Sequence, residues 1–217
     1  MAANETRLLV LGAVSLFEPV NGYQIRRELM SWEVDRWAHI FPGSIYSSLS
    51  TLTRQGHLRR HDLTDGGRAV AVYTSTDAGR AELRALFQRA LETVEVLDPL
   101  PLHTALSMCT LFPRASVARS LETRVRALGE HLAELRRRHA GLGWDGVPPH
   151  VARVLELRVS LVEVELAWAE TLLEDVHAGA LGFAGEPQGW QPDPDDPGWQ
   201  MAKNRVRYRE LLQSGEC

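Results

Sequence analysis

The sequence predicts a mainly α-helical fold, in which a winged helix-turn-helix domain with a two-stranded wing precedes a C-terminal antiparallel helical domain. Three observations predict it. Apolar residues recur at helical spacing in both halves, the spacing changes to strict alternation between residues 57 and 74, and two long seam-like helical patterns follow. We expect three parts. A winged helix-turn-helix domain with a linker helix spans residues 1–97, a helical domain spans residues 98–180, and a Pro/Gly-rich tail with a short terminal helix spans residues 181–217.

Composition narrows the class of protein. The 217 residues are 44% apolar and 24% charged, which is typical of globular proteins and unlike disordered or membrane proteins. The sequence contains no run of about 18 apolar residues, the length that a membrane-spanning helix needs. Acidic Glu5 precedes the N-terminal apolar run, and we interpret this segment as mature protein. Cys109 and Cys217 form neither a disulfide framework nor a metal pattern, which favours a reducing, cytoplasmic setting.

The segment from residue 54 to residue 68 is locally basic although the chain carries a net charge of −4. Its ionisable side chains are Arg54, His57, Arg59, Arg60, His61, Asp62, Asp65 and Arg68. A basic patch of this kind indicates an anionic partner, and the alternative is a solvated hairpin without one.

The first helices are predicted by their apolar spacing and their boundaries. A helix from about Glu5 to Phe17 ends before Pro19, and Asn21 begins a second helix over 22–30. A connector rich in aromatic residues follows.

A third helix begins at Pro42-Gly43 and ends before Gly56. Its inward stripe has helical spacing: Ile45, Leu49 and Leu52. Its opposite side carries Ser44, Ser47, Thr51 and Arg54. Short hydroxyl side chains let another surface come close, so this side suits a helix that enters the major groove of DNA, where Ser and Thr bond base edges or phosphates and Arg binds guanine.

A hairpin follows this helix. Alternating residues over 57–63 and 69–74 flank a loop at Thr64–Arg68 that contains two glycines. Thr76 then caps a helix that ends at Asp98-Pro99. Three helices and a basic hairpin beside a Ser/Thr-faced helix form a winged helix-turn-helix, with the third helix as reader and the hairpin as wing.

Three blocks of sequence in the first 90 residues resemble the PadR family of transcriptional regulators. They are GYQIRREL, FPGSIYSSLSTLTRQGHL and VYTSTDAGRAEL, in the order and spacing of that family. The resemblance implies a dimeric, usually repressing regulator whose C-terminal helices dimerise and help to form an effector site. It also implies that Tyr46 meets a phosphate, and the alternative for Tyr46 is a packing role.

We therefore expect a regulator that binds double-stranded DNA at a near-palindromic operator. The expected DNA contacts are Tyr23, Ser44, Tyr46, Ser47, Thr51, Arg54, Arg59, Arg60 and Arg68. The alternative is a winged-helix module that binds proteins and not DNA, because this fold does not always bind nucleic acid.

Two seam patterns, over residues 115–139 and 155–176, predict the helical domain. The later helix has a second apolar stripe, which a second subunit would cover in a homodimer. The expected dimer interface consists of Leu157, Leu161, Leu166, Trp168 and Leu173. The alternative is a monomeric bundle that buries both stripes internally.

Four aromatic residues, Trp32, Trp37, Phe41 and Trp168, are candidates for a pocket that takes a small aromatic effector; the alternative is a packing role for each. No nucleophile–base pair, metal set or phosphate loop has usable spacing, so we expect no catalytic residue, cofactor or metal. Asp193, Asp195 and Asp196 lack the glycine and terminal glutamate of a calcium loop and are expected to be solvated.

Overall fold

The computed structural model describes residues 2–141, 148–187, 193–196 and 198–214. Residues 142–147, which separate the two predicted seam patterns, part of the predicted tail and Cys217 lie outside the described residues. The described elements are α1 (Ala2–Phe17), β1 (Val20–Asn21), α2 (Gly22–Ser31), α3 (Val34–Trp37), α4 (Pro42–Arg54), β2 (Leu58–Asp65), β3 (Arg68–Ser75), α5 (Asp77–Glu92), α6 (Leu100–Met108), the 3₁₀ turn η1 (Cys109–Leu111), α7 (Arg114–Gly141), α8 (Pro149–Ala178) and α9 (Gly198–Ser214).

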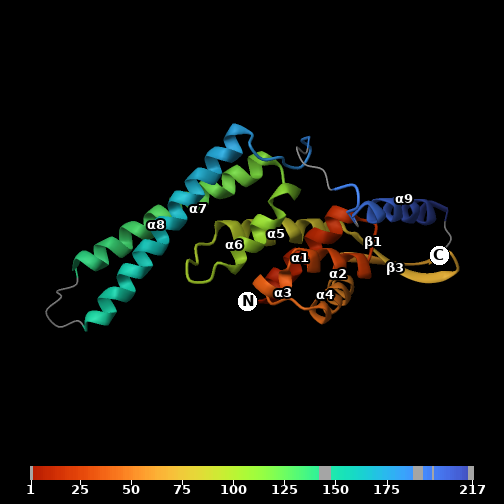
Figure 1. Ribbon diagram of the computed structural model, residues 1–217, viewed down its shortest axis with the longest axis horizontal. Coiled ribbons are helices and arrows are strands. Elements are labelled where there is room, and N and C mark those ends of the chain that lie inside the picture. The colour runs from red at the N-terminus through yellow and green to blue at the C-terminus, as the bar shows by residue number, and fades with distance from the viewer. Residues whose placement is uncertain (1, 142–147, 188–192, 197, 215–217) are drawn as a thin grey trace.

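The elements form an elongated molecule (Figure 1). Helices α1–α5 and the sheet gather at one end, and the long antiparallel pair α7 and α8 projects from the other. The last helix, α9, returns to lie along the sheet. The predicted mainly helical winged fold with a C-terminal antiparallel helical pair is confirmed.

The wing is a hairpin whose sheet gains a third strand. Strands β2 and β3 pair antiparallel from Leu58↔Ser75 to Asp65↔Arg68. The loop between them is shorter than predicted, because Gly66 and Gly67 have φ of 57° and 79° and close a two-residue turn. The predicted two-stranded hairpin is present, and β1, which was not predicted, pairs with β3 and gives the sheet the order β1-β3-β2. A two-residue strand is too short to show alternation in the sequence.

One apolar core joins the winged domain to α6 and to the start of α7. Leu102 and Met108 of α6 are buried in the same cluster as the apolar side of α1. The rings of Phe87 on α5 and Phe112 stack with centroids 3.8 Å apart. Residues on both sides of position 97 therefore share this core.

Helix α5 is shorter than the sequence predicts, and this expectation was wrong. It ends at Glu92, and its C-cap Thr93 has the extended conformation φ −78°, ψ 125°. The guanidinium of Arg124, from α7, donates from Nη1 to the carbonyl oxygens of Leu91 and Thr93 at 2.9 and 2.7 Å. A side chain from a distant helix thus donates to backbone carbonyl oxygens that would accept hydrogen bonds from the next helical turn if α5 continued. Helix α6, which was not predicted, begins after the linker.

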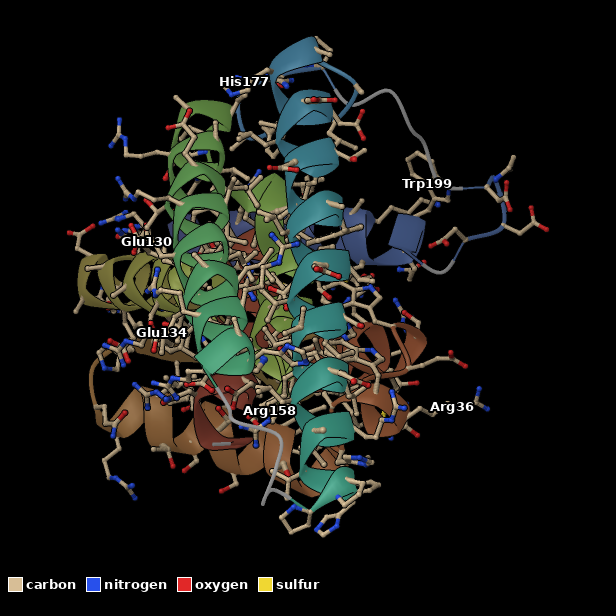
Figure 2. All side chains as sticks on the ribbon, turned by 90° about the vertical axis from the view of Figure 1, so that its left-hand side faces the viewer. Arg36, Glu130, Glu134, Arg158, His177 and Trp199 are labelled. Carbon is tan, nitrogen blue, oxygen red and sulfur yellow. The ribbon has the colours of Figure 1, made fainter. Side chains whose placement is uncertain are left out.

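Helices α7 and α8 pack along the predicted seam. Figure 2 shows them side by side at the end of the molecule, with Glu130 and Glu134 pointing outward from α7. Between them Leu128, Leu132 and Val162 are buried in one cluster, with Leu155, Val159 and Leu166 packed against it. The predicted inward stripes of both helices are confirmed.

Helix α9 covers one face of the wing. Tyr208 is buried in a small cluster with Leu63 of β2 and Val72 of β3. Its hydroxyl accepts a hydrogen bond from Asn21 Nδ2 at 2.9 Å, and Arg207 forms an ion pair with Asp65 near the hairpin turn. The sequence predicts the helix but not its position against the wing.

Candidate nucleic-acid interface

Helix α4 is fixed by its apolar side. Phe41, in extended conformation, is its N-cap, Pro42 stands in its first turn, and Gly56 follows its C-cap with φ 76°. Ile45, Leu49 and Leu52 are at most 1% exposed. The predicted inward stripe is confirmed. Its burial fixes the rotation of the helix about its axis, so the opposite side faces outward.

That opposite side presents short polar side chains to solvent. Ser44, Ser47 and Arg54 are exposed, and Thr51 is half-buried. Thr53, on the flank, donates its hydroxyl to the Leu49 carbonyl oxygen at 2.8 Å, so its polar atom is already used within the helix. The structure thus brings the predicted hydroxyls and Arg54 together on one accessible helix face.

Two tyrosines border this face. Tyr46 is 45% exposed, and its ring lies against Gly22, where an added Cβ would come within 3.1 Å of Tyr46 Cε1. Tyr23 is 58% exposed. The guanidinium of Arg26 lies 5.2 Å from the centre of the Tyr23 ring. Arg26 was not among the predicted contacts, although its spacing of three from Tyr23 on a helix is a signal that sequence reasoning can use.

The three wing arginines do not share one face. Side chains alternate along a strand, so Arg60 projects from one face, while Arg59 and Arg68 project from the face that carries Leu63 and Val72. All three arginines are exposed. Figure 1 shows α4 and α9 on different sides of the wing, and α9 covers the Leu63 face. Arg60 therefore projects from the face opposite α9, and the exposed Arg68 stands beside the hairpin turn.

Arg60 is held by a neighbouring carboxylate. Its Nη2 lies 2.7 Å from Asp62 Oδ1, one pleat further along β2. The hydrogen bond to Asp62, together with its charge, raises the pKa of Arg60 above the ordinary value. A phosphate that binds Arg60 would have to share it with Asp62.

The four aromatic residues predicted for an effector pocket do not converge on one described cavity. Trp32 and Trp37 pack against the core, and Trp37 Nε1 donates to the Trp32 carbonyl oxygen at 2.8 Å. Phe41 is 57% exposed beside α4, and Trp168 lies on α8. A cavity of about 190 Å³ between α1, α5 and the linker to α6 has other lining residues.

The residues predicted for the dimer interface lie on two sides of α8. Leu157 and Trp168 are 58% and 41% exposed. Leu166 packs into the seam with α7, and Leu173 packs against the main core, so both already have partners within the chain. Leu161 is half-buried between these two sides.

Other classes of site find no support in the part of the chain that the structure describes. No three His, Cys, Asp or Glu side chains there are grouped so that they could hold a metal ion, Asp193, Asp195 and Asp196 included. No helix within the described ranges is both long and apolar enough to cross a membrane.

Comparison with solved structures finds matches among transcriptional regulators. Bacillus subtilis PadR in complex with operator DNA is 20% identical, with 78% of this chain and 96% of that chain covered and a TM-score of 0.33. A PadR-like transcriptional regulator from Bacillus cereus is 19% identical, with 80% and 99% covered and a TM-score of 0.31. B. subtilis PadR in complex with p-coumaric acid is 18% identical, with 79% and 97% covered and a TM-score of 0.30.

These TM-scores are low, so the assignment to a family rests on the sequence. No curated protein matches the chain. The family model described as the transcriptional regulator PadR-like family matches residues 10–85, which run from α1 through α4 and the wing into α5. Residues 10–85 of this chain are therefore a domain of the transcriptional regulator PadR-like family.

Proposed function

We propose that the protein is a sequence-specific DNA-binding transcriptional regulator, and that it represses its target until a small molecule releases it. The observation that carries the proposal is the exposed face of α4, on which Ser44, Ser47 and Arg54 stand opposite a fully buried apolar stripe. The match of residues 10–85 to a family of transcriptional regulators supports it.

In the proposed complex, α4 lies in the major groove. Hydroxyls of Ser44, Ser47 and Thr51 bond base edges or phosphates, and Arg54 binds guanine through two parallel hydrogen bonds. Tyr46 and Tyr23, whose rings border the face, donate their hydroxyls to phosphates. The positive charges of Arg60 and Arg68 on the wing attract the phosphate backbone without reading the base sequence.

A second copy of the chain completes the DNA-binding unit. Apolar residues follow one another along α8 at spacings of three and four: the exposed Val151, Val154, Leu157, Val164 and Trp168, with the half-buried Leu161 between Leu157 and Val164. A two-fold axis along this stripe would bury it and set two α4 helices about 34–36 Å apart on a near-palindromic operator. We propose this homodimer, with residues 98–180 as the dimerisation and effector domain.

DNA binding by the intact protein tests the proposal. The DNA fragment upstream of the protein's own gene is labelled, and fluorescence anisotropy is measured for the wild type, for the double variant Arg54→Ala/Arg68→Ala, and for Arg137→Ala. Arg137 lies on α7 in an exposed ion pair with Glu134, so this control removes a positive charge away from α4, the wing and the exposed stripe of α8. We expect the double variant alone to lose affinity.

Equal binding by all three proteins would remove α4 and the wing from the interface. If the wild type binds neither its own promoter nor unrelated duplex at low salt, the fold serves another partner, and the protein-binding alternative takes the place of the regulator.

A further inference from the structure

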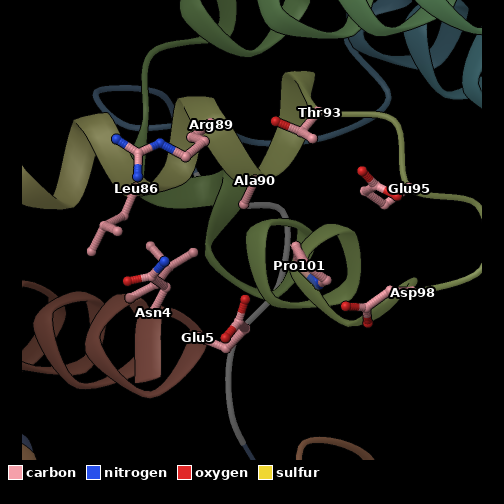
Figure 3. A pocket seen from close by; sticks show the side chains of 10 residues that line it. Asn4, Glu5, Leu86, Arg89, Ala90, Thr93, Glu95, Asp98 and Pro101 are labelled. Atoms are coloured by element: carbon pink, nitrogen blue, oxygen red, sulfur yellow. The ribbon is translucent and has the colours of Figure 1, made fainter. Parts of the chain in front are cut away.

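A cavity of about 190 Å³ opens where the winged domain meets the helical domain. Its lining comes from the first turns of α1, the end of α5, the linker after Thr93 and the start of α6: Asn4, Glu5, Leu8, Leu86, Arg89, Ala90, Thr93, Glu95, Asp98 and Pro101. Figure 3 shows these side chains arranged around the hollow, with the Glu5 carboxylate directed between Ala90 and Pro101.

Glu5 is the unusual residue of this cavity. It is only 7% exposed, and its Oε2 is buried without a hydrogen-bond partner in the described part of the chain. An acid in the first turn of a helix is favoured by the helix dipole, but an exposed carboxylate would provide that interaction equally well. Burying a carboxylate with an unsatisfied oxygen costs free energy unless a partner arrives. The position of Glu5 therefore indicates a ligand that supplies a donor.

The remaining lining residues specify the charge and shape of that ligand. Three of the lining residues are apolar, namely Ala90 and the buried Leu8 and Leu86, so the ligand needs an apolar part. Glu95 and Asp98 add two carboxylates on the linker side. Figure 3 shows the Arg89 guanidinium directed toward Leu86 and away from Glu5. The lining thus carries three carboxylates and one guanidinium, and this excess of negative charge favours a cationic ligand.

We infer that this cavity binds a small hydrophobic amine in its protonated form, with the ammonium on Glu5 and the apolar part on Leu8, Leu86 and Ala90. An ammonium has three donors, and the carboxylate of Glu5, the amide of Asn4 and the hydroxyl of Thr93 all line the cavity as possible acceptors. A cavity of about 150 Å³ is known to hold benzene, so the volume suits one ring with a short aminoalkyl chain.

The same cavity is placed to act on the rest of the molecule. Thr93 lines it, and the Thr93 carbonyl oxygen accepts a hydrogen bond from Arg124 Nη1, whose guanidinium also binds Glu165 of α8. A ligand that moves the Thr93–Asp98 linker would shift α5 against the α7–α8 pair. The effector role of the amine rests on the proposed function, whereas its binding does not.

Calorimetric titration of the full-length protein with three matched probes tests the binding. The probes are 2-phenylethylamine, 2-phenylethanol and phenylacetate, which share one ring and differ in charge. We expect the amine to bind at least about tenfold more tightly than the alcohol, because a hydrogen bond between two ions is about twice as strong as a neutral one. Phenylacetate should bind most weakly. Equal affinities, or a preference for phenylacetate, would overturn the inference.

Variants then locate the site. Glu5→Gln keeps the shape and removes the charge, so it should abolish the preference for the amine and leave the alcohol unchanged. Glu95→Gln removes an exposed carboxylate at the same cavity and should have a smaller effect, because solvent screens it. Ala90→Leu fills the cavity and should weaken amine and alcohol alike. Thermal unfolding checks that each variant is folded, and amine binding that survives both Glu5→Gln and Ala90→Leu places the amine elsewhere.

Anisotropy with the promoter fragment separates the binding site from the effector role. The amine should lower DNA affinity by the same factor by which DNA lowers amine affinity, because coupling between two sites is reciprocal. Glu5-dependent amine binding that leaves DNA affinity unchanged would overturn the effector role and keep the site. A protein that binds no DNA would contradict the proposed function, and the calorimetry would still decide the site.

Discussion

The guanidinium of Arg124 on α7 donates from Nε to Glu165 Oε1 on α8 at 2.9 Å, and Arg124 is only 1% exposed. The same guanidinium donates through Nη1 to two carbonyl oxygens at the end of α5. One side chain thus joins the last helix of the winged domain to both helices of the projecting pair. Its burial makes each of these bonds sensitive to the loss of a partner.

Replacing Arg124 should destabilise the protein strongly. Arg124→Met fills a similar volume but leaves Glu165 without its ion pair, and breaking a buried pair costs about 3–5 kcal/mol. Arg136→Ala removes an exposed partner of Glu163 on the same two helices and should cost less than about 1 kcal/mol. Urea unfolding monitored by circular dichroism measures both, and equal losses would show that the Arg124 network is energetically ordinary.

Replacing Arg54 and replacing Arg68 should change the salt dependence and the sequence specificity of DNA binding in different ways. Arg54→Ala, on the exposed face of α4, should cost about 1–3 kcal/mol of binding and relax specificity at one base pair in each half-site. Arg68→Ala, on the wing, should weaken all sequences similarly and lower the slope of log K against log salt by about one. Anisotropy titrations at several salt concentrations with operator and scrambled DNA distinguish the two; identical profiles would contradict the division into reader and wing.

The exposed stripe of α8 should hold the dimer together. Val164 is 70% exposed, so Val164→Glu leaves the fold of one chain intact but places a charge in the proposed interface. Leu166→Glu, which enters the seam with α7, should lower stability as well. Light scattering should give twice the 24.2 kDa chain mass for the wild type and one chain mass for Val164→Glu. A wild-type mass of one chain would disprove the dimer and the near-palindromic operator.

Acid should weaken the wing through His61. Burial, and then the positive charge of Arg59, lower the pKa of His61 below its ordinary value of 6.5. The folded state thus favours the neutral ring, so the stabilisation is present above the unfolded pKa and is lost as pH falls through the folded pKa. The free energy of unfolding of the wild type, relative to His61→Gln, should fall as pH is lowered from about 7.5 to about 5. A pH-independent difference would refute this.

Helix α9 should hold the wing in place. Tyr208→Phe removes the hydrogen bond with Asn21 and should cost about 0.5–1.5 kcal/mol. Tyr208→Ala also empties the cluster with Leu63 and Val72, and it should speed amide exchange in β2 and β3 while leaving exchange in α8 unchanged. Mass-spectrometric hydrogen exchange measures this, and an unchanged wing in Tyr208→Ala would mean that the hairpin stands without α9.

The features that the sequence predicts correctly are those that follow from the local spacing of apolar residues. The buried stripe of Ile45, Leu49 and Leu52 follows from spacings of four and three, and it sets the opposite face of α4 without knowledge of the fold. Alternation from residue 57 onward likewise predicts the hairpin. The exposed apolar stripe of α8 follows from the same kind of pattern.

The features that sequence reasoning misses depend on contacts between distant residues. Helix α5 ends early because Arg124 donates hydrogen bonds to the carbonyl oxygens at its end. No sequence pattern near Glu92 predicts this contact with a residue of α7. Arg59 and Arg60 are adjacent in sequence and were grouped as one patch, but the pleat sends them to opposite faces of the sheet. The cavity around Glu5 is assembled from four segments, whereas the aromatic residues that composition made prominent lie apart.

The hydrogen bond between Asn21 and Tyr208 joins positions 187 residues apart in the chain. Closing so long a loop costs conformational entropy that grows with the logarithm of its length. Contacts of high sequence separation also form slowly. During synthesis, the wing hairpin emerges long before α9 exists to cover Leu63 and Val72, so that face of the sheet stays open until the chain is almost fully translated. A nascent chain should thus display an apolar wing surface to chaperones for most of its synthesis, and the finished protein should hide it.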